Sequence, residues 1–219
     1  MDNYITALHF KWSHPNPKKR HLSPYRHTPI IYGANIQYAS EPPFSPALND
    51  KGIYHVQSIV GALLYYARAV DNKLLVALNK LGQQQASSTK DTDATLIQIL
   101  DHVATYPNAG ILFRASGMVL AGHSDATYLN VSKARSHAGV HIMLSEETPV
   151  PTRNGPVLTI AKIIKFVMSS AAEAKISGLF ICAKAMVHFE IPSLKWVGQS
   201  PNTPSSAITP LPWMYLTTP

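Results

Sequence analysis

The chain has 219 residues, of which 46% are hydrophobic, and 19 Lys and Arg stand against 12 Asp and Glu for a formal charge of +7. This hydrophobic share is typical of globular proteins and argues against a wholly disordered chain. The single cysteine, Cys182, excludes a disulfide framework and an all-cysteine metal site. The first residues lack the apolar core of a signal peptide, and no apolar run is long enough to span a membrane. We therefore expect a cytoplasmic or nuclear protein that is not secreted and has no membrane partner.

Residues 1–52 are predicted to form a proline-rich basic arm. Seven of the 17 prolines lie before residue 50, and dense prolines oppose packed helices and central strands. The arm carries a basic run with no acidic residue inside it, and this run is either a solvated loop or a phosphate-contacting segment. On the second interpretation Lys18, Lys19 and Arg20 would bind nucleic acid. The full run is Lys11, Lys18, Lys19, Arg20 and Arg26.

Residues 53–107 are predicted to be helical, because apolar residues recur there at helical spacing. Helices are expected over 53–71 and 73–85, and a third begins at a cap formed by Asp91 or Thr92 and ends before Pro107. We assign these helices to core packing. The residues expected to face the core are Ile53, Val56, Ile59, Val60, Leu63, Leu64 and Ala67, then Leu74, Leu75, Leu78 and Leu81, then Leu96, Ile97, Leu100 and Val103.

After Pro107 the hydrophobic pattern alternates as in strands, and Ser116-Gly117 predicts a hairpin turn. Ser169-Ser170 is then expected to cap a long helix that ends near residue 190. Helices, a run of strands and a final helix make this an α+β fold. The four expected strands are 110–115, 118–126, 140–144 and 157–160.

Two carboxylates are candidates for chemistry. Asp125 lies within an apolar strand-like run, where it either needs a partner, namely a cation, a metal or a nearby Ser, Thr or His, or caps the turn at 127–130. Glu173 follows Ser170 by three residues, so it either acts in a site or completes a capping box. His123 shares a strand face with Asp125, but the ten histidines form no metal-binding motif. Cys182 lies in an apolar helical stretch, where a thiol is usually inert.

Four colinear segments resemble the copia-type retroelement Pol polyprotein. They are IVGALLYYARAVDNKLLVALNKLGQQQ, ILDHVATYPNAGILFRASGMVLAGHSDATYLN, SKARSHAGVHIML and NGPVLTIAKIIKFVMSSAAEAKISGLF. In that family they link the reverse transcriptase to the first half of the ribonuclease H domain. The opening NYITALHFKWSHP is similar to the last helix of the reverse transcriptase, so the resemblance covers residues 3–205.

The resemblance implies a ribonuclease H-like mixed sheet whose carboxylates hold two Mg²⁺ ions for hydrolysis of RNA in RNA–DNA hybrids. Asp125 matches the first-strand Asp of the family. Glu173 matches the first Glu of the helix pattern SSxxEAE, but Lys175 stands where the second, metal-binding Glu is expected. A residue two positions away on a helix points about 200° away, so Glu173 does not replace it. The segment 203–209, which matches the next acidic motif, contains no acid.

The expected domains are therefore the arm (1–52, the end of the reverse transcriptase-like region), a helical connection segment (53–107), a truncated ribonuclease H-like domain (108–205) and an irregular tail (206–219). Pro192 is expected to cut the long helix short. The function expected is that of a retroelement fragment with an inactive nuclease, in which the Mg²⁺ of the family is not bound productively. The alternatives are an active Mg²⁺-dependent hybrid ribonuclease that uses Asp125, and a non-catalytic module that binds hybrid or duplex nucleic acid or a protein.

Overall fold

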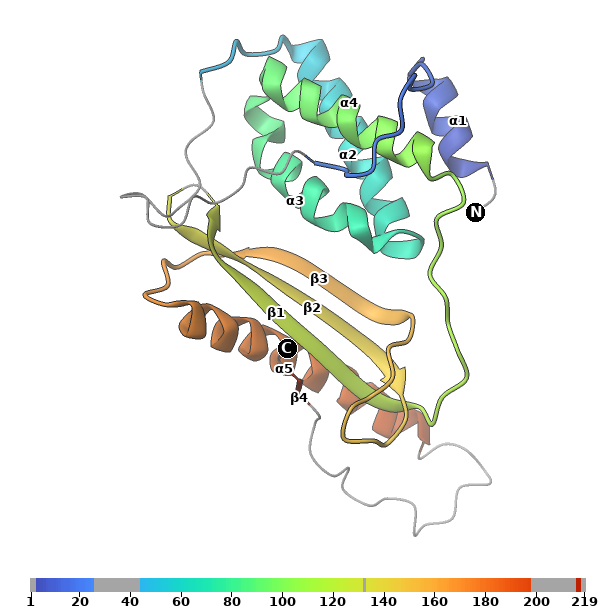
Figure 1. Cartoon of the computed structure of the whole chain (residues 1–219), viewed down its shortest axis with the longest axis vertical. Helices are drawn as coiled ribbons and strands as arrows, with labels where there is room; N and C mark the ends of the chain where they lie inside the picture. The colour runs from blue at the N-terminus through green and yellow to red at the C-terminus, as the bar shows by residue number, and fades with distance from the viewer. Residues whose placement is uncertain (1–2, 26–43, 132, 198–215, 218–219) are drawn as a thin grey trace. The chain divides into compact units, whose positions relative to one another are not determined.

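The computed structural model describes residues 3–25, 44–131, 133–197 and 216–217, and Arg26 of the basic run lies outside them (Figure 1). The chain divides into two compact units, with unit 1 ending at Ile111 and unit 2 continuing from Leu112. Unit 1 is helical, and unit 2 contains the sheet and one long helix. The α+β class predicted from the sequence is confirmed. Within the described residues, no helix combines the length and the apolar character that crossing a bilayer requires.

Within its described residues, unit 1 contains four α-helices, joined in part by the 3-10 turns η1 (Asn72–Leu74) and η2 (Gln85–Ser87). Asn49 caps α2 by accepting a hydrogen bond from the Gly52 N–H. The cap of α4 is Thr89 rather than Asp91 or Thr92, because Thr89 and Thr92 bond reciprocally in a capping box that places Thr92 in the first turn. The helices are α1 (Tyr4–Lys11), α2 (Asp50–Ala69), α3 (Leu75–Gln84) and α4 (Lys90–Thr105).

The core of unit 1 is formed by the apolar stripes of α2, α3 and α4. All four predicted leucines of the second helix are buried. In α4, however, Ile97 is 45% exposed and Ile99 is fully buried, so the prediction for Ile97 is wrong. The buried stripe also includes Leu96, Leu100 and Val103. Ile99 lies three residues after Leu96 and four before Val103, so helical spacing places Ile99, and not Ile97, on the same face as these two residues.

The predicted arm contains more helix than its prolines suggested. Residues 4–11 form α1, as the resemblance of the opening segment implied, and α2 begins at Asp50. Residues 12–25 and 44–49 contain no helix or strand apart from a bridge at Ala47. The prolines of the described arm lie in these irregular stretches, where no backbone donor is lost from a helix.

Unit 2 is built on three antiparallel strands, β1 (Val119–Val131), β2 (Arg135–Ser145) and β3 (Pro156–Ile164). A two-residue strand, β4 (Leu216–Thr217), pairs with β1 in the parallel direction, so the sheet is mixed with the order β3-β2-β1-β4. Part of the tail predicted to be irregular therefore supplies backbone partners to an edge of β1 that would otherwise be open.

The predicted strand over 110–115 is absent, and Ser116-Gly117 is not a hairpin turn. The backbone of Arg114 is instead satisfied by the Asn154 side chain, whose Oδ1 accepts from its N–H and whose Nδ2 donates to its carbonyl. A segment whose polar groups are paired with a side chain does not need a neighbouring strand. The observed hairpin joins β1 to β2, and Lys133 and Ala134 there adopt left-handed backbone conformations.

Helix α5 (Ala171–Val197) lies along one face of the sheet (Figure 1). Small residues of β1 allow this close approach: a Cβ at Gly122 would lie 2.5 Å from Met186 Sδ and 2.7 Å from Cys182 Sγ. Helix α5 also continues past Pro192, which contradicts the prediction that this proline ends it. A proline removes one backbone donor from a helix, and a helix can kink at such a residue and continue.

Candidate functional site

Asp125 lies near the middle of β1, a strand with a neighbour on each side. Strand alternation places it on the same face as His123 and Thr127, whereas Ala126 packs in the core beneath α5. Its cross-strand partner on β2 is Gly139, which presents no side chain. The Asp125 side chain is consequently 58% exposed, and its Oδ1 accepts a hydrogen bond from the Ala126 N–H at 2.8 Å.

The N-terminal part of α5 lies next to Asp125. Gly178 approaches β1 so closely that a Cβ there would lie 3.3 Å from the Asp125 carbonyl oxygen. Lys175, three residues earlier, places its Nζ 3.9 Å from Asp125 Oδ1. The resemblance matched Asp125 to a strand and Glu173 to the start of a helix, and the structure brings Asp125 next to the start of that helix. Because both side chains are about half exposed, the ion pair contributes at most about 1 kcal/mol to stability.

Glu173 bonds backward to the start of its helix. Its Oε2 accepts from the N–H and from the hydroxyl of Ser169, each at 2.6 Å, and the Glu173 N–H donates to Ser170 Oγ at 3.1 Å. These hydrogen bonds from Ser169 lower the pKa of Glu173. The contacts are those of the capping alternative, with the carboxylate reaching one residue beyond Ser170.

The donor set around Asp125 does not suit a pair of divalent cations. Two hard cations about 4 Å apart require several carboxylate oxygens, whereas an ammonium lies beside Asp125 and Glu173 bonds to Ser169. His123 and its cross-strand partner His141 share this face, and burial lowers the pKa of His123, with Arg153 and His141 adding to the effect. In the described part of the chain, no three His, Cys, Asp or Glu side chains are grouped as a metal site. The acid-free segment 203–209 lies outside the described residues.

Cys182 is fully buried between α5 and the sheet, as expected of an inert thiol. Burial raises its pKa to about 11. A thiol protonated at neutral pH is a poor nucleophile and a poor metal ligand, so Cys182 belongs to the core.

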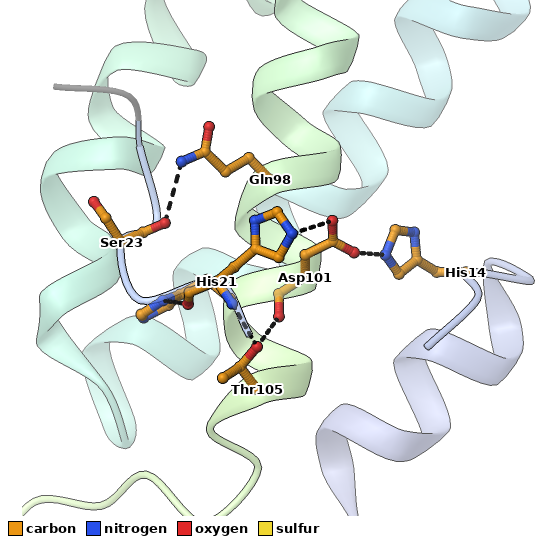
Figure 2. A network of polar contacts seen from close by, with 7 residues as sticks. His14, His21, Ser23, Gln98, Asp101 and Thr105 are labelled. Atoms are coloured by element: carbon orange, nitrogen blue, oxygen red, sulfur yellow. Dashed lines mark hydrogen bonds and ion pairs between the residues drawn. The ribbon is translucent and has the colours of Figure 1, made fainter. Parts of the chain in front are cut away.

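The basic run lies in unit 1, next to α4. Lys18, Lys19 and Arg20 are all exposed, and the Arg20 guanidinium lies 5.9 Å from the centre of the Tyr106 ring. On either side of these three residues, His14 and His21 contact the carboxylate of Asp101 (Figure 2). The exposed cations are therefore held between two anchored residues.

Sequence reasoning missed this anchoring network because α4 was assigned only to core packing. A signal was present: Gln98, Asp101, His102 and Thr105 recur at intervals of three and four residues, and such spacing places polar side chains on one helix face. What the sequence does not reveal is which distant segment these side chains contact. The contacts join residues more than 70 positions apart.

Comparison of the chain with protein-family models, with curated proteins and with solved structures gives no significant match.

Proposed function

We propose that the chain derives from the Pol polyprotein of a copia-type retroelement, and that unit 2 is a degenerate ribonuclease H-like domain without nuclease activity. The observation that carries the proposal is the Lys175–Asp125 ion pair at 3.9 Å. It places an ammonium beside the one strand carboxylate that the resemblance assigns to metal binding. The mixed sheet, the position of Asp125 on the first strand and the long helix packed on that sheet all support the same origin.

The electrostatics explain why this arrangement disfavours catalysis. A carboxylate cluster must offset the four positive charges of two Mg²⁺ ions and set their spacing. Asp125 contributes one carboxylate, and Lys175 adds a positive charge that repels a cation and competes for the same oxygen. Glu173 already accepts two hydrogen bonds from Ser169. In this proposal Mg²⁺ belongs to the ancestral domain and takes no productive part here.

A cleavage assay tests the proposal. The purified chain should not cleave a labelled RNA–DNA hybrid above background with Mg²⁺ or Mn²⁺, while a known hybrid ribonuclease does so in parallel. Lys175→Glu should remain inactive because the third acid is still missing, and Lys175→Gln controls for loss of the ammonium alone. Robust metal-dependent cleavage that Asp125→Asn abolishes would overturn the proposal and support the active-nuclease alternative.

A second function, sequence-independent nucleic-acid binding, is favoured by a separate observation in unit 1. Lys18, Lys19 and Arg20 are adjacent and exposed, and no ion pair joins them to an acid in the described part of the chain. Such a group suits the phosphates of a hybrid or duplex, whose contacts release counterions and weaken steeply with salt.

Fluorescence anisotropy with a labelled RNA–DNA hybrid tests this second function. Replacing the three basic residues by Ala should weaken binding and reduce the slope of log affinity against log salt by about 2–3, since each phosphate contact contributes about 0.9. The control is Lys51→Ala, Lys73→Ala and Lys80→Ala, which removes the same charge from exposed lysines elsewhere in unit 1. Equal losses in both triple variants, or salt-insensitive binding, would refute a phosphate site at the basic run.

A further inference from the structure

One face of α4 carries four polar residues that all contact the segment from Ser13 to Tyr25, hereafter the anchored segment. Gln98, Asp101, His102 and Thr105 follow at intervals of three, one and three residues, which places them on one side of the helix. Because these polar side chains share one side of α4 and all contact the anchored segment, together they form its binding face. This face holds the anchored segment on α4 (Figure 2).

Asp101 is the centre of the network. Its Oδ1 lies 2.8 Å from His14 Nε2 and its Oδ2 lies 3.4 Å from His21 Nε2. The side chains of Asp101 and His14 are only 15% and 9% exposed. Because an ionised carboxylate can only accept, the hydrogen bond between His14 Nε2 and Asp101 Oδ1 places the proton on His14 Nε2, whereas His21 makes a longer ion-pair contact. One carboxylate thus holds both ends of the stretch between His14 and His21.

The backbone of the anchored segment is also bound. The His21 N–H donates to Thr105 Oγ1 at 3.1 Å, and the His21 carbonyl accepts from His102 Nδ1 at 2.8 Å. Thr105 Oγ1 in turn donates to the Asp101 carbonyl at 2.8 Å. Further along, Gln98 Nε2 donates to the Ser23 carbonyl at 3.2 Å. Because both backbone groups of His21 are bound, these contacts determine the path of the main chain at His21, while Asp101 orients the His21 side chain.

Lys18, Lys19 and Arg20 of the basic run lie between the two residues bound by Asp101. Lys18 and Lys19 form an exposed bend, and Arg20 lies over the Tyr106 ring of the same anchoring region. The surroundings of Asp101 contain further titratable side chains, His9 from α1 and His102 from α4, and burial together with His14 lowers the pKa of His9. The run is therefore presented on a short loop with both ends held.

We propose that the anchored segment is a preformed phosphate-binding loop for nucleic acid, and that Asp101 is its positioning residue. The inference rests on the proposed nucleic-acid binding, and it adds that affinity depends on the buried network as well as on the exposed charges. A loop whose backbone is ordered before binding avoids the entropic cost of ordering that backbone in the complex.

The sign of one substitution separates this idea from simple charge attraction. Asp101→Asn removes a negative charge near the basic run, so charge alone predicts tighter binding to a polyanion. Asparagine keeps one acceptor oxygen, but its Nδ2 cannot accept from a histidine N–H, so the substitution can keep the contact to one of His14 and His21 and loses the other. Positioning therefore predicts weaker binding, by about three- to tenfold.

Anisotropy titrations with the same labelled hybrid measure the effect on the full chain. Asp93→Asn, on the first turn of the same helix, removes an equal charge and should leave affinity unchanged or slightly higher. Thr105→Val changes no charge and removes the hydroxyl that accepts from His21, so it should weaken binding about two- to threefold. Circular dichroism reports whether Asp101→Asn folds, and if it does not fold, Thr105→Val tests the anchoring in its place.

Two further measurements follow the anchoring itself and then separate positioning from a merely structural effect. Hydrogen exchange at the His21 amide should be faster in Asp101→Asn. In the background with Lys18, Lys19 and Arg20 replaced by Ala, Asp101→Asn should weaken the residual binding no further, because it acts through those side chains. If the wild type binds the hybrid and Asp101→Asn binds it as tightly as Asp93→Asn does, the positioning role is overturned and the nucleic-acid function stands. If the wild type does not bind the hybrid at low salt, both the nucleic-acid function and the positioning role are overturned. The same holds if it binds an acidic polypeptide and not the hybrid.

Discussion

Replacing Gly122 by Ala should weaken the packing of α5 on β1, which is the contact that brings Lys175 to Asp125. The added Cβ would lie 2.5 Å from Met186 Sδ and 2.7 Å from Cys182 Sγ. Favourable contacts between such atoms lie near about 3.5–4.0 Å, so the overlap is about 1 Å at each sulfur. The side chain of Met186 can move, but Cys182 is short and fully buried, so part of the strain must be taken up by a shift of the helix.

Two opposing effects set the magnitude. Overpacking of a filled core costs about 1–3 kcal/mol. Alanine also reduces the conformational freedom of the unfolded chain, which returns about 0.4–1 kcal/mol. The expected net loss in the free energy of unfolding is about 1–2 kcal/mol. For a unit of this size that loss lowers the urea midpoint by about 1 M.

Gly139→Ala is the matched control. Gly139 lies in the adjacent strand, a Cβ there would meet no atom closer than 3.9 Å, and neither glycine has a left-handed backbone. The control should therefore be neutral or slightly stabilising. Adding Cys182→Ala to Gly122→Ala should recover about 1 kcal/mol relative to the sum of the single changes, because the two side chains compete for one space.

Urea unfolding followed by circular dichroism measures the free energies, and hydrogen exchange of β1 amides assigns the loss to unit 2. If Gly122→Ala is as stable as Gly139→Ala, or if Cys182→Ala shows no coupling to it, then α5 does not approach β1 as described.

Two further predictions concern single groups in unit 2. The hydrogen bonds from Ser169 hold the pKa of Glu173 below its ordinary value, so its contribution to stability is complete above the ordinary carboxyl pKa and is lost as the pH falls through the lower folded pKa. Unfolding curves between about pH 3 and pH 7 should accordingly show less acid destabilisation for Glu173→Gln than for the wild type, and parallel curves would contradict the capping role. Burial raises the pKa of Cys182 to about 11, so a thiol reagent at about pH 8 should label it only after unfolding, and labelling of the native protein at the rate of a free cysteine would contradict its burial.

The buried faces of α2 and α3 were predictable because each helix buries apolar residues that recur in the sequence at helical spacing. The leucines of α3 illustrate this, since their spacing alone places them inward. The strand pattern of residues 118–126 likewise identified β1, although the observed strand runs on to Val131. Such predictions depend only on neighbours within one element.

In the candidate site, only contacts between residues of one secondary-structure element could be predicted from the sequence. Ser170 and Glu173 are three residues apart, so their capping contact follows from local helix geometry. The strand over 110–115 failed as a prediction because Asn154, 40 residues away, satisfies the backbone of Arg114. Sequence spacing contains no information about such a distant partner.

By itself, the sequence determined the α+β class, most of the apolar stripes and the adjacency of the basic residues Lys18, Lys19 and Arg20. Only the tertiary structure decided that Lys175 lies beside Asp125, that β4 joins β1 in parallel, and that Asp101 binds His14 and His21. The physical reason is the range of the interactions. Periodicity and capping act over a few residues, whereas these contacts join side chains and strands that meet only after the chain has packed.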